Sequence, residues 1–117
     1  MNIAIIGSRK FTDYEFLKSE MEKFISEYSF DEVVIVSGGA KGADSLAEKF
    51  ANEKVYKTLI FQPEWEKYER EACRLRNTQI VENAEVVFAF WDGTSPGTKD
   101  SIEKAKKLGK FLYIHLF

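Results

Sequence analysis

The stretch VSGGAKGADS, residues 36–45, joins an apolar run to a helical pattern and decides the fold. The run that leads into it, EVVIVSG at residues 32–38, is almost continuously apolar, which is typical of a parallel strand covered on both faces. Behind it, apolar side chains recur at helical spacing at Ala43, Leu46, Ala47, Phe50 and Ala51. The stretch therefore predicts a glycine-rich joint between a buried strand and a helix.

The rest of the chain repeats this alternation. Further strand-like runs lie at residues 2–7, 58–61, 85–91 and 111–117, with helical patterns between them. This order predicts an α/β fold, a Rossmann-like doubly wound three-layer sandwich of about five parallel strands in the order 3-2-1-4-5. The last run is expected at an edge of the sheet, and residues 1–117 are expected to form one domain because no linker interrupts them.

Helix boundaries follow from local signals. Thr12 with Glu15 resembles a capping box for the first helix, and Phe11 with Phe16 resembles its hydrophobic staple. The third helix is expected to run from residue 65 to residue 84. Thr98 is placed to cap the last helix, with Ser95 and Pro96 as the alternative start, and Gly109 ends it.

Composition restricts the class of protein. Nineteen acidic residues exceed seventeen basic ones, giving a net charge of -2, which argues against a broad nucleic-acid footprint. The chain has a single cysteine, Cys73, which predicts a reducing compartment. The expected role of its side chain is that of a small buried core residue. No apolar run reaches the ~20 residues that cross a bilayer. We therefore expect a cytoplasmic protein without a membrane or nucleic-acid partner, and, because no Cys/His cluster has ligand spacing, without a metal or other cofactor.

Glycine gathers at one edge of the expected sheet. The strand-to-helix joints are GSRKFT, SGGAKGAD, QPEW and WDGTSPGT, beginning at residues 7, 37, 62 and 91. Three of these four joints hold glycine beside a hydroxyl residue, whereas the joints at residues 28–31 and 53–57, on the opposite edge, hold none. Ligands of doubly wound folds bind beyond the carboxyl ends of the strands, so a binding site is expected at the glycine-rich edge.

The loop at residues 37–42 has two explanations. Its glycines permit close approach of the backbone to a phosphate at a helix N-terminus, or they only make a tight turn and allow close helix packing. Lys41 precedes Gly42, so the loop is not a Walker A motif. The first joint also lacks the dinucleotide fingerprint G-x-G-x-x-G. An ordinary nucleotide hydrolase and a standard dehydrogenase are therefore not expected.

Arg76 and Asn77 fall on the inward stripe of the third predicted helix, where unpaired donors are costly. They either bind loop carbonyls or reach the crevice and meet an anion, and one side chain can do both. Trp65 and Trp91 lie beside the crevice and either stack on a ring or pack the ends of the core. The candidate ligand-binding residues are Gly7, Ser8, Arg9, Ser37, Gly38, Gly39, Lys41, Gly42, Asp44, Trp65, Arg76, Asn77, Asp92, Gly97 and Thr98.

Four motifs in this order, IAIIGSR, VSGGAKGADSLAE, RLRN and FWDGTSPGT, resemble the YspA-like branch of the SLOG superfamily over nearly the whole chain. The superfamily includes the LOG phosphoribohydrolases and the DNA-processing protein DprA. The resemblance implies a Rossmann-like domain that senses or processes nucleotide-derived ligands. It is also compatible with a homodimer that pairs through helices.

Matching the LOG motifs to this chain reveals departures. Their glycine loop resembles Gly38, Gly39 and Gly42, whereas their Arg-Lys pair corresponds to Arg76 and Asn77, so the lysine is absent. Their catalytic glutamate falls on Ser101, which cannot serve as an acid. An N-glycosidase needs such a group, and no catalytic residue is assigned. Asp44 and Asp92 are the carboxylates on other loops.

Three functions follow from these observations. The first is a sensor or sequestering module for a small nucleotide-derived ligand, such as ADP-ribose, NAD or a nucleoside monophosphate. The alternative is a nucleoside 5'-monophosphate N-glycosidase of the LOG type. The third, which the net charge of -2 disfavours, is a single-stranded DNA binder like DprA.

Overall fold

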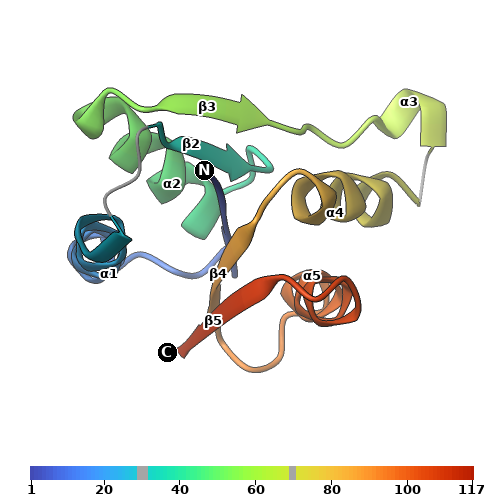
Figure 1. The fold of residues 1–117 in the computed structure, drawn as a ribbon. Helices are drawn as coiled ribbons and strands as arrows, with labels where there is room; N and C mark the ends of the chain where they lie inside the picture. Colours follow the sequence, from blue (N-terminus) through green and yellow to red (C-terminus); the bar gives the residue numbers. More distant parts are fainter. Residues whose placement is uncertain (29–31, 69–70) are drawn as a thin grey trace.

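The computed structural model describes residues 1–28, 32–68 and 71–117, which form a central sheet between two layers of helices (Figure 1). Its strands are β1 (Asn2–Gly7), β2 (Val34–Ser37), β3 (Lys57–Ile60), β4 (Val86–Trp91) and β5 (Phe111–Leu116). All four pairings are parallel and the order is β3-β2-β1-β4-β5, which confirms the predicted fold and the edge position of the last strand. Residues 29–31 of the first glycine-free joint lie outside the described residues.

The helices are α1 (Tyr14–Tyr28), α2 (Ala43–Lys54), α3 (Trp65–Tyr68), α4 (Ala72–Glu82) and α5 (Pro96–Lys107). The prediction of one helix over residues 65–84 is wrong, because α3 ends at Tyr68 and α4 begins separately at Ala72. Residues 69 and 70 between them lie outside the described part. Within the described ranges, no helix is both long enough and apolar enough to span a bilayer.

Side chains of β1 alternate between two cores. Ile3 and Ile5 pack with Leu17 and Met21 of α1 and with Phe50 of α2. On the opposite face, Ala4 and Ile6 pack with Ile80 and Val81 of α4 and with Ile102 and Ala105 of α5. The central strands are therefore apolar on both faces, as the near-continuous apolar runs predicted.

The start of α1 differs from the predicted capping box. The Asp13 carboxylate accepts a hydrogen bond from the amide N–H of Phe16 at 3.1 Å, so Asp13 and not Thr12 caps the helix. Phe11 is buried and Phe16 is 37% exposed, and both rings pack against Phe90. The two candidate caps are adjacent in sequence, and the position of the first helical residue, Tyr14, decides between them.

Candidate functional site

A hollow of about 410 Å³ lies at the carboxyl ends of β1 and β4, the edge at which the sequence predicted a site. Four segments enclose it: the loop after β1, the start of α2, one face of α4 and the first turn of α5. It is lined by Ile6, Gly7, Ser8, Arg9, Lys10, Ala40, Asp44, Cys73, Arg76, Asn77, Ile80, Ser95, Pro96, Gly97, Thr98 and Ser101.

Ser8 joins the loop after β1 to the loop before α5. Its hydroxyl lies 2.9 Å from that of Ser95 and accepts a hydrogen bond from the amide N–H of Asp92 at 3.2 Å. Because the Ser95 hydroxyl donates to the Asp92 carboxylate at 2.8 Å, Ser8 is the donor in the serine pair. Ser8 is only 2% exposed, so this network holds the two loops together beneath the hollow.

Asp92 organises the turn that leads into α5. Its carboxylate accepts the amide N–H groups of Ser95 at 2.8 Å and Thr94 at 2.9 Å. These hydrogen bonds, chiefly that of Ser95, hold the pKa of Asp92 well below its ordinary value of 3.8, so the group is ionised at neutral pH. Asp92 therefore serves the loop and does not line the hollow.

The first turn of α5 presents backbone donors to the hollow. Ser95 caps the helix and Pro96 takes the first helical position, so the alternative start is confirmed and the cap prediction for Thr98 is wrong. In the described structure, no hydrogen bond engages the amide N–H of Gly97 or Thr98. Both residues line the hollow, where free N–H groups at a helix N-terminus favour an anion.

Arg76 and Asn77 bind loop carbonyls and also line the hollow. The Arg76 guanidinium donates to the carbonyl of Gly38 at 2.7 Å and to the side-chain oxygen of Asn77 at 3.1 Å. A Cβ atom at Gly38 would collide with the Arg76 guanidinium, so glycine makes room for it. These two side chains, which are 9% and 7% exposed, therefore hold loop carbonyls and reach the crevice at the same time.

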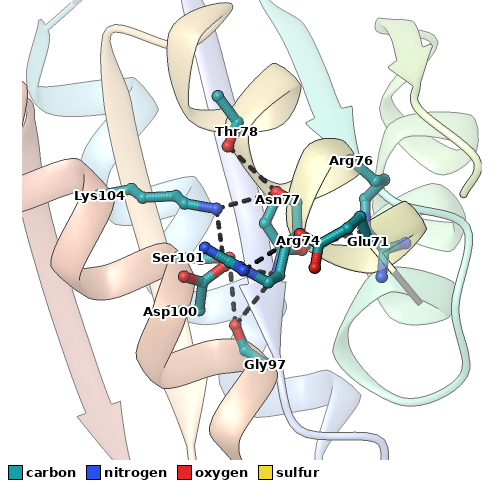
Figure 2. A network of polar contacts seen from close by, with 9 residues as sticks. All are labelled: Glu71, Arg74, Arg76, Asn77, Thr78, Gly97, Asp100, Ser101 and Lys104. Carbon is teal, nitrogen blue, oxygen red and sulfur yellow. Dashed lines mark hydrogen bonds and ion pairs between the residues drawn. The ribbon is translucent and has the colours of Figure 1, made fainter. Parts of the chain in front are cut away.

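Asn77 continues the network to α5 (Figure 2). Its amide group donates to the carbonyl of Gly97 at 3.3 Å and to the Asp100 carboxylate at 3.2 Å. Lys104 pairs with the same carboxylate at 2.8 Å and donates to the carbonyl of Arg74. Lys104 therefore joins α5 to α4.

Asp44 is a buried acid at the hollow, with 7% of its surface exposed. Its carboxylate accepts the amide N–H of Ala40 at 3.2 Å. Burial raises the pKa of Asp44 above its ordinary 3.8, and the Ala40 hydrogen bond and the nearby Arg76 oppose this rise. Asp44 therefore places a buried carboxyl group on the wall of the hollow.

The structure gathers about half of the predicted site residues. Those that line the hollow are Gly7, Ser8, Arg9, Asp44, Arg76, Asn77, Gly97 and Thr98. Of the others, Ser37 ends β2, and the surrounding loops hold Gly38, Gly39, Lys41, Gly42 and Asp92. Trp65 begins α3, and its side chain lies outside the described part.

Sequence reasoning missed several lining residues. Lys10 follows the predicted Arg9, and Ser95 and Pro96 precede the predicted Gly97, so proximity in the chain was an available signal. Cys73 is half-buried at the hollow and is therefore not a core filler. The described residues contain no cluster of three or more His, Cys, Asp or Glu that could hold a metal ion.

Comparison with known proteins identifies the family. The model of the YspA, cpYpsA-related SLOG family matches residues 1–68. The chain belongs to this family. The Gene 61 protein of Mycobacterium phage D29, one relative of this SLOG chain, is 33% identical to it over 117 residues, covering 92% of this chain and 90% of that protein.

The fold of this SLOG protein also occurs in DNA processing protein A, DprA, from Helicobacter pylori. The TM-score is 0.74 with 22% sequence identity, covering 97% of this chain and 64% of the DprA chain. The chain thus spans somewhat less than two thirds of the DprA chain that it matches. That structure was determined for the single-stranded DNA binding mode of DprA.

This comparison corrects two predictions for the SLOG chain. The predicted function was binding of a small nucleotide-derived ligand, with a LOG-type N-glycosidase as the alternative, and the predicted partners disfavoured nucleic acid. Both expectations are contradicted, because the similar structure belongs to a protein that binds single-stranded DNA. Net charge misled the prediction because it averages over the whole surface, whereas the hollow brings together a few donors.

Proposed function

We propose that this chain binds single-stranded DNA and that the 410 Å³ hollow receives one phosphate group of the strand. The observation that carries the proposal is the convergence of unengaged amide N–H groups at Gly97 and Thr98 with the side chains of Arg9 and Lys10 in one hollow. The shared fold with DprA supports it. We further propose that residues 1–117 act as one domain in the cytoplasm.

The donors suit a phosphate group. The N-terminus of α5 offers two N–H groups and a positive dipole end, which together favour a phosphate oxygen. Arg9 and Lys10 are exposed, and no ion pair engages them in the described part of the structure. They are available to neutralise the phosphate charge from solvent.

Each acidic side chain around the hollow has partners that stabilise or offset its negative charge. Asp92 is stabilised by two amide N–H groups, and Asp100 pairs with Lys104 and Asn77. Asp44 is buried, its carboxylate accepts the amide N–H of Ala40, and the nearby Arg76 offsets its charge. Repulsion of the phosphate is therefore smaller than a count of carboxylates suggests.

The shape of the site favours a single strand over a duplex. A phosphate must enter a recess formed by four segments, and a flexible single strand can bend one phosphate into it more easily than a stiff duplex can. A net charge of -2 also disfavours the many simultaneous contacts of duplex binding. We therefore propose a small footprint centred on one phosphate.

Fluorescence anisotropy with a labelled oligothymidylate tests the proposal, with a labelled duplex of the same length for comparison. Arg9→Ala should weaken single-strand binding about tenfold, because a charge-assisted hydrogen bond contributes about 1.5 kcal/mol. Lys106→Ala, an exposed lysine on α5 outside the hollow, is the matched control and should change affinity little. Equal loss in both variants, or no binding by the unmodified chain, would contradict the proposal.

A further inference from the structure

The outer edge of β5, together with the residues beside it, carries most of the exposed large apolar side chains of the described residues. Ten large apolar side chains in the described ranges are more than a third exposed, and eight of them lie in residues 108–117 or on α1 beside β5. The five from β5 and the residue after it are Phe111 (72% exposed), Tyr113 (37%), Ile114 (39%), Leu116 (68%) and Phe117 (52%). Scattered apolar residues are ordinary, but a concentration at one edge marks an interaction surface.

The two edges of the sheet differ in their protection. β3, at one edge, has only four residues and carries the exposed Lys57, which pairs with Glu32 at 2.8 Å. β5, at the other edge, has six residues and contains no Lys, Arg, Asp, Glu or Pro. Short length and lysine are common means by which proteins block unwanted strand pairing, so β3 is blocked and β5 is open.

We propose that β5 is the interface of a homodimer in which the β5 strands of two copies pair antiparallel around a two-fold axis. The segment 111–117 contains no Asp, Glu, Lys or Arg, so pairing with itself opposes no fixed like charges of these side chains. Centred on Ile114, the pairing places Phe111 opposite Phe117 and Leu112 opposite Leu116 of the other copy. Each opposed pair lies on the same face, as an antiparallel ladder requires.

The available area is sufficient for a second copy. The five side chains of residues 111–117 together expose about 500 Å², taking roughly 200 Å² for each fully exposed large side chain. Phe16, whose ring lies 5.4 Å from that of His115, and Tyr28 are also exposed and raise this to about 700 Å². A stable interface buries about 800 Å² per partner, so apolar side chains alone nearly reach that size before the backbone edge is counted.

This interface differs from the helix-mediated dimer that the family resemblance suggested. It is independent of the proposed DNA site, since none of the residues 108–117 lines the 410 Å³ hollow. Its test therefore requires no DNA, and failure of one proposal leaves the other standing.

Sedimentation equilibrium of the chain across the micromolar range tests the dimer. The unmodified chain should approach twice its monomer mass, and Ile114→Lys should shift it to monomer while circular dichroism shows a retained fold. Leu75→Lys is the matched control, because Leu75 is also 39% exposed but lies on α4, and it should stay dimeric. A monomeric unmodified chain, larger open assemblies, or a dimer insensitive to Ile114→Lys would overturn the proposal.

Cross-linking decides the register even if the lysine variant fails to fold. Ile114→Cys should form an intermolecular disulfide under mild oxidation, since opposed antiparallel residues lie about 4.5–5.5 Å apart at Cα, within disulfide range. The unmodified chain, whose single cysteine is Cys73, is the control and should not cross-link. Absence of the cross-link from a dimeric sample of the Ile114→Cys variant would exclude the proposed pairing.

Discussion

At the scale of single residues, Gly42 shows how the site depends on close backbone contact. Its φ of 75° and ψ of -128° lie in a region that residues with a side chain avoid. A Cβ atom there would also lie 2.6 Å from the carbonyl oxygen of Arg9. The glycine therefore allows the start of α2 to pack against the loop that lines the hollow.

Gly42→Ala should destabilise the protein by about 3 kcal/mol, combining about 1–2 kcal/mol of backbone strain with the cost of overpacking. Gly93→Ala is the control, because Gly93 has a φ of 86° but no neighbour within 4 Å of a new Cβ. It should lose about 1 kcal/mol from strain alone. Urea denaturation measures both, and equal losses would show that the contact with the Arg9 loop is unimportant.

Asp44 gives a second prediction at this scale. Its folded pKa is raised, so the native state binds its proton more tightly than the unfolded chain does. Stability from this group is therefore greatest below pH 3.8 and falls as pH rises from there through the raised folded pKa. Asp92, whose pKa is lowered, has the opposite sign, and its contribution is lost as pH falls below 3.8 towards its folded pKa.

Asp44→Asn should remove the decline above pH 3.8. The stability of the variant relative to that of the unmodified chain should therefore increase as pH rises, because the amide carries no charge to bury. Urea denaturation from pH 4 to pH 7 measures the difference between the two proteins at each pH. A difference that does not change with pH would mean that Asp44 does not titrate in this range.

At the scale of secondary structure elements, the ends of helices were harder to predict than their existence. Both Thr12 and Asp13 are suitable caps, as are Ser95 and Thr98, and local pattern does not distinguish them. The capping residue is the one that tertiary structure places beside the free amide groups of the first turn. Asp13 caps α1 because its carboxylate accepts the amide N–H of Phe16. Ser95 takes the cap position of α5 because the Asp92 carboxylate holds the turn that contains it.

Asp13→Ala should destabilise α1 by about 1 kcal/mol, the usual cost of losing a side-chain cap. Thr12→Ala should change stability by less than about 0.5 kcal/mol, because Thr12 is exposed and no side-chain hydrogen bond from it is found in the described structure. Thermal denaturation of the two variants measures the contrast. A larger loss of stability in Thr12→Ala than in Asp13→Ala would contradict capping by Asp13 and support the capping box that the sequence suggested.

At the scale of the whole molecule, the order and direction of all five strands followed from the sequence, because alternation and strand burial are encoded locally. The sequence predicted only part of the candidate site. Gly38 was expected to meet a ligand, yet its carbonyl binds Arg76, a residue far along the chain whose reach no local pattern shows. Partner class was predicted wrongly because net charge carries no information about where the charges lie.

The small footprint also makes a prediction for the whole molecule. Each phosphate neutralised on a single strand contributes a slope of about -0.7 to the plot of log affinity against log salt concentration. With one phosphate bound in the hollow beside Arg9 and Lys10, we expect a slope of about -0.7, which becomes shallower in Arg9→Ala. Anisotropy titrations at several salt concentrations provide the slopes, and a steep slope unaffected by the substitution would place binding elsewhere.

The most direct test of the central claim is the amide NMR spectrum of the isotopically labelled chain during titration with oligothymidylate. If the first turn of α5 holds a backbone phosphate, the largest shifts will occur at the amide signals of Gly97 and Thr98, with smaller shifts at Ser8 and Arg9. If these signals stay in place while signals from another surface move, the hollow is not the DNA site.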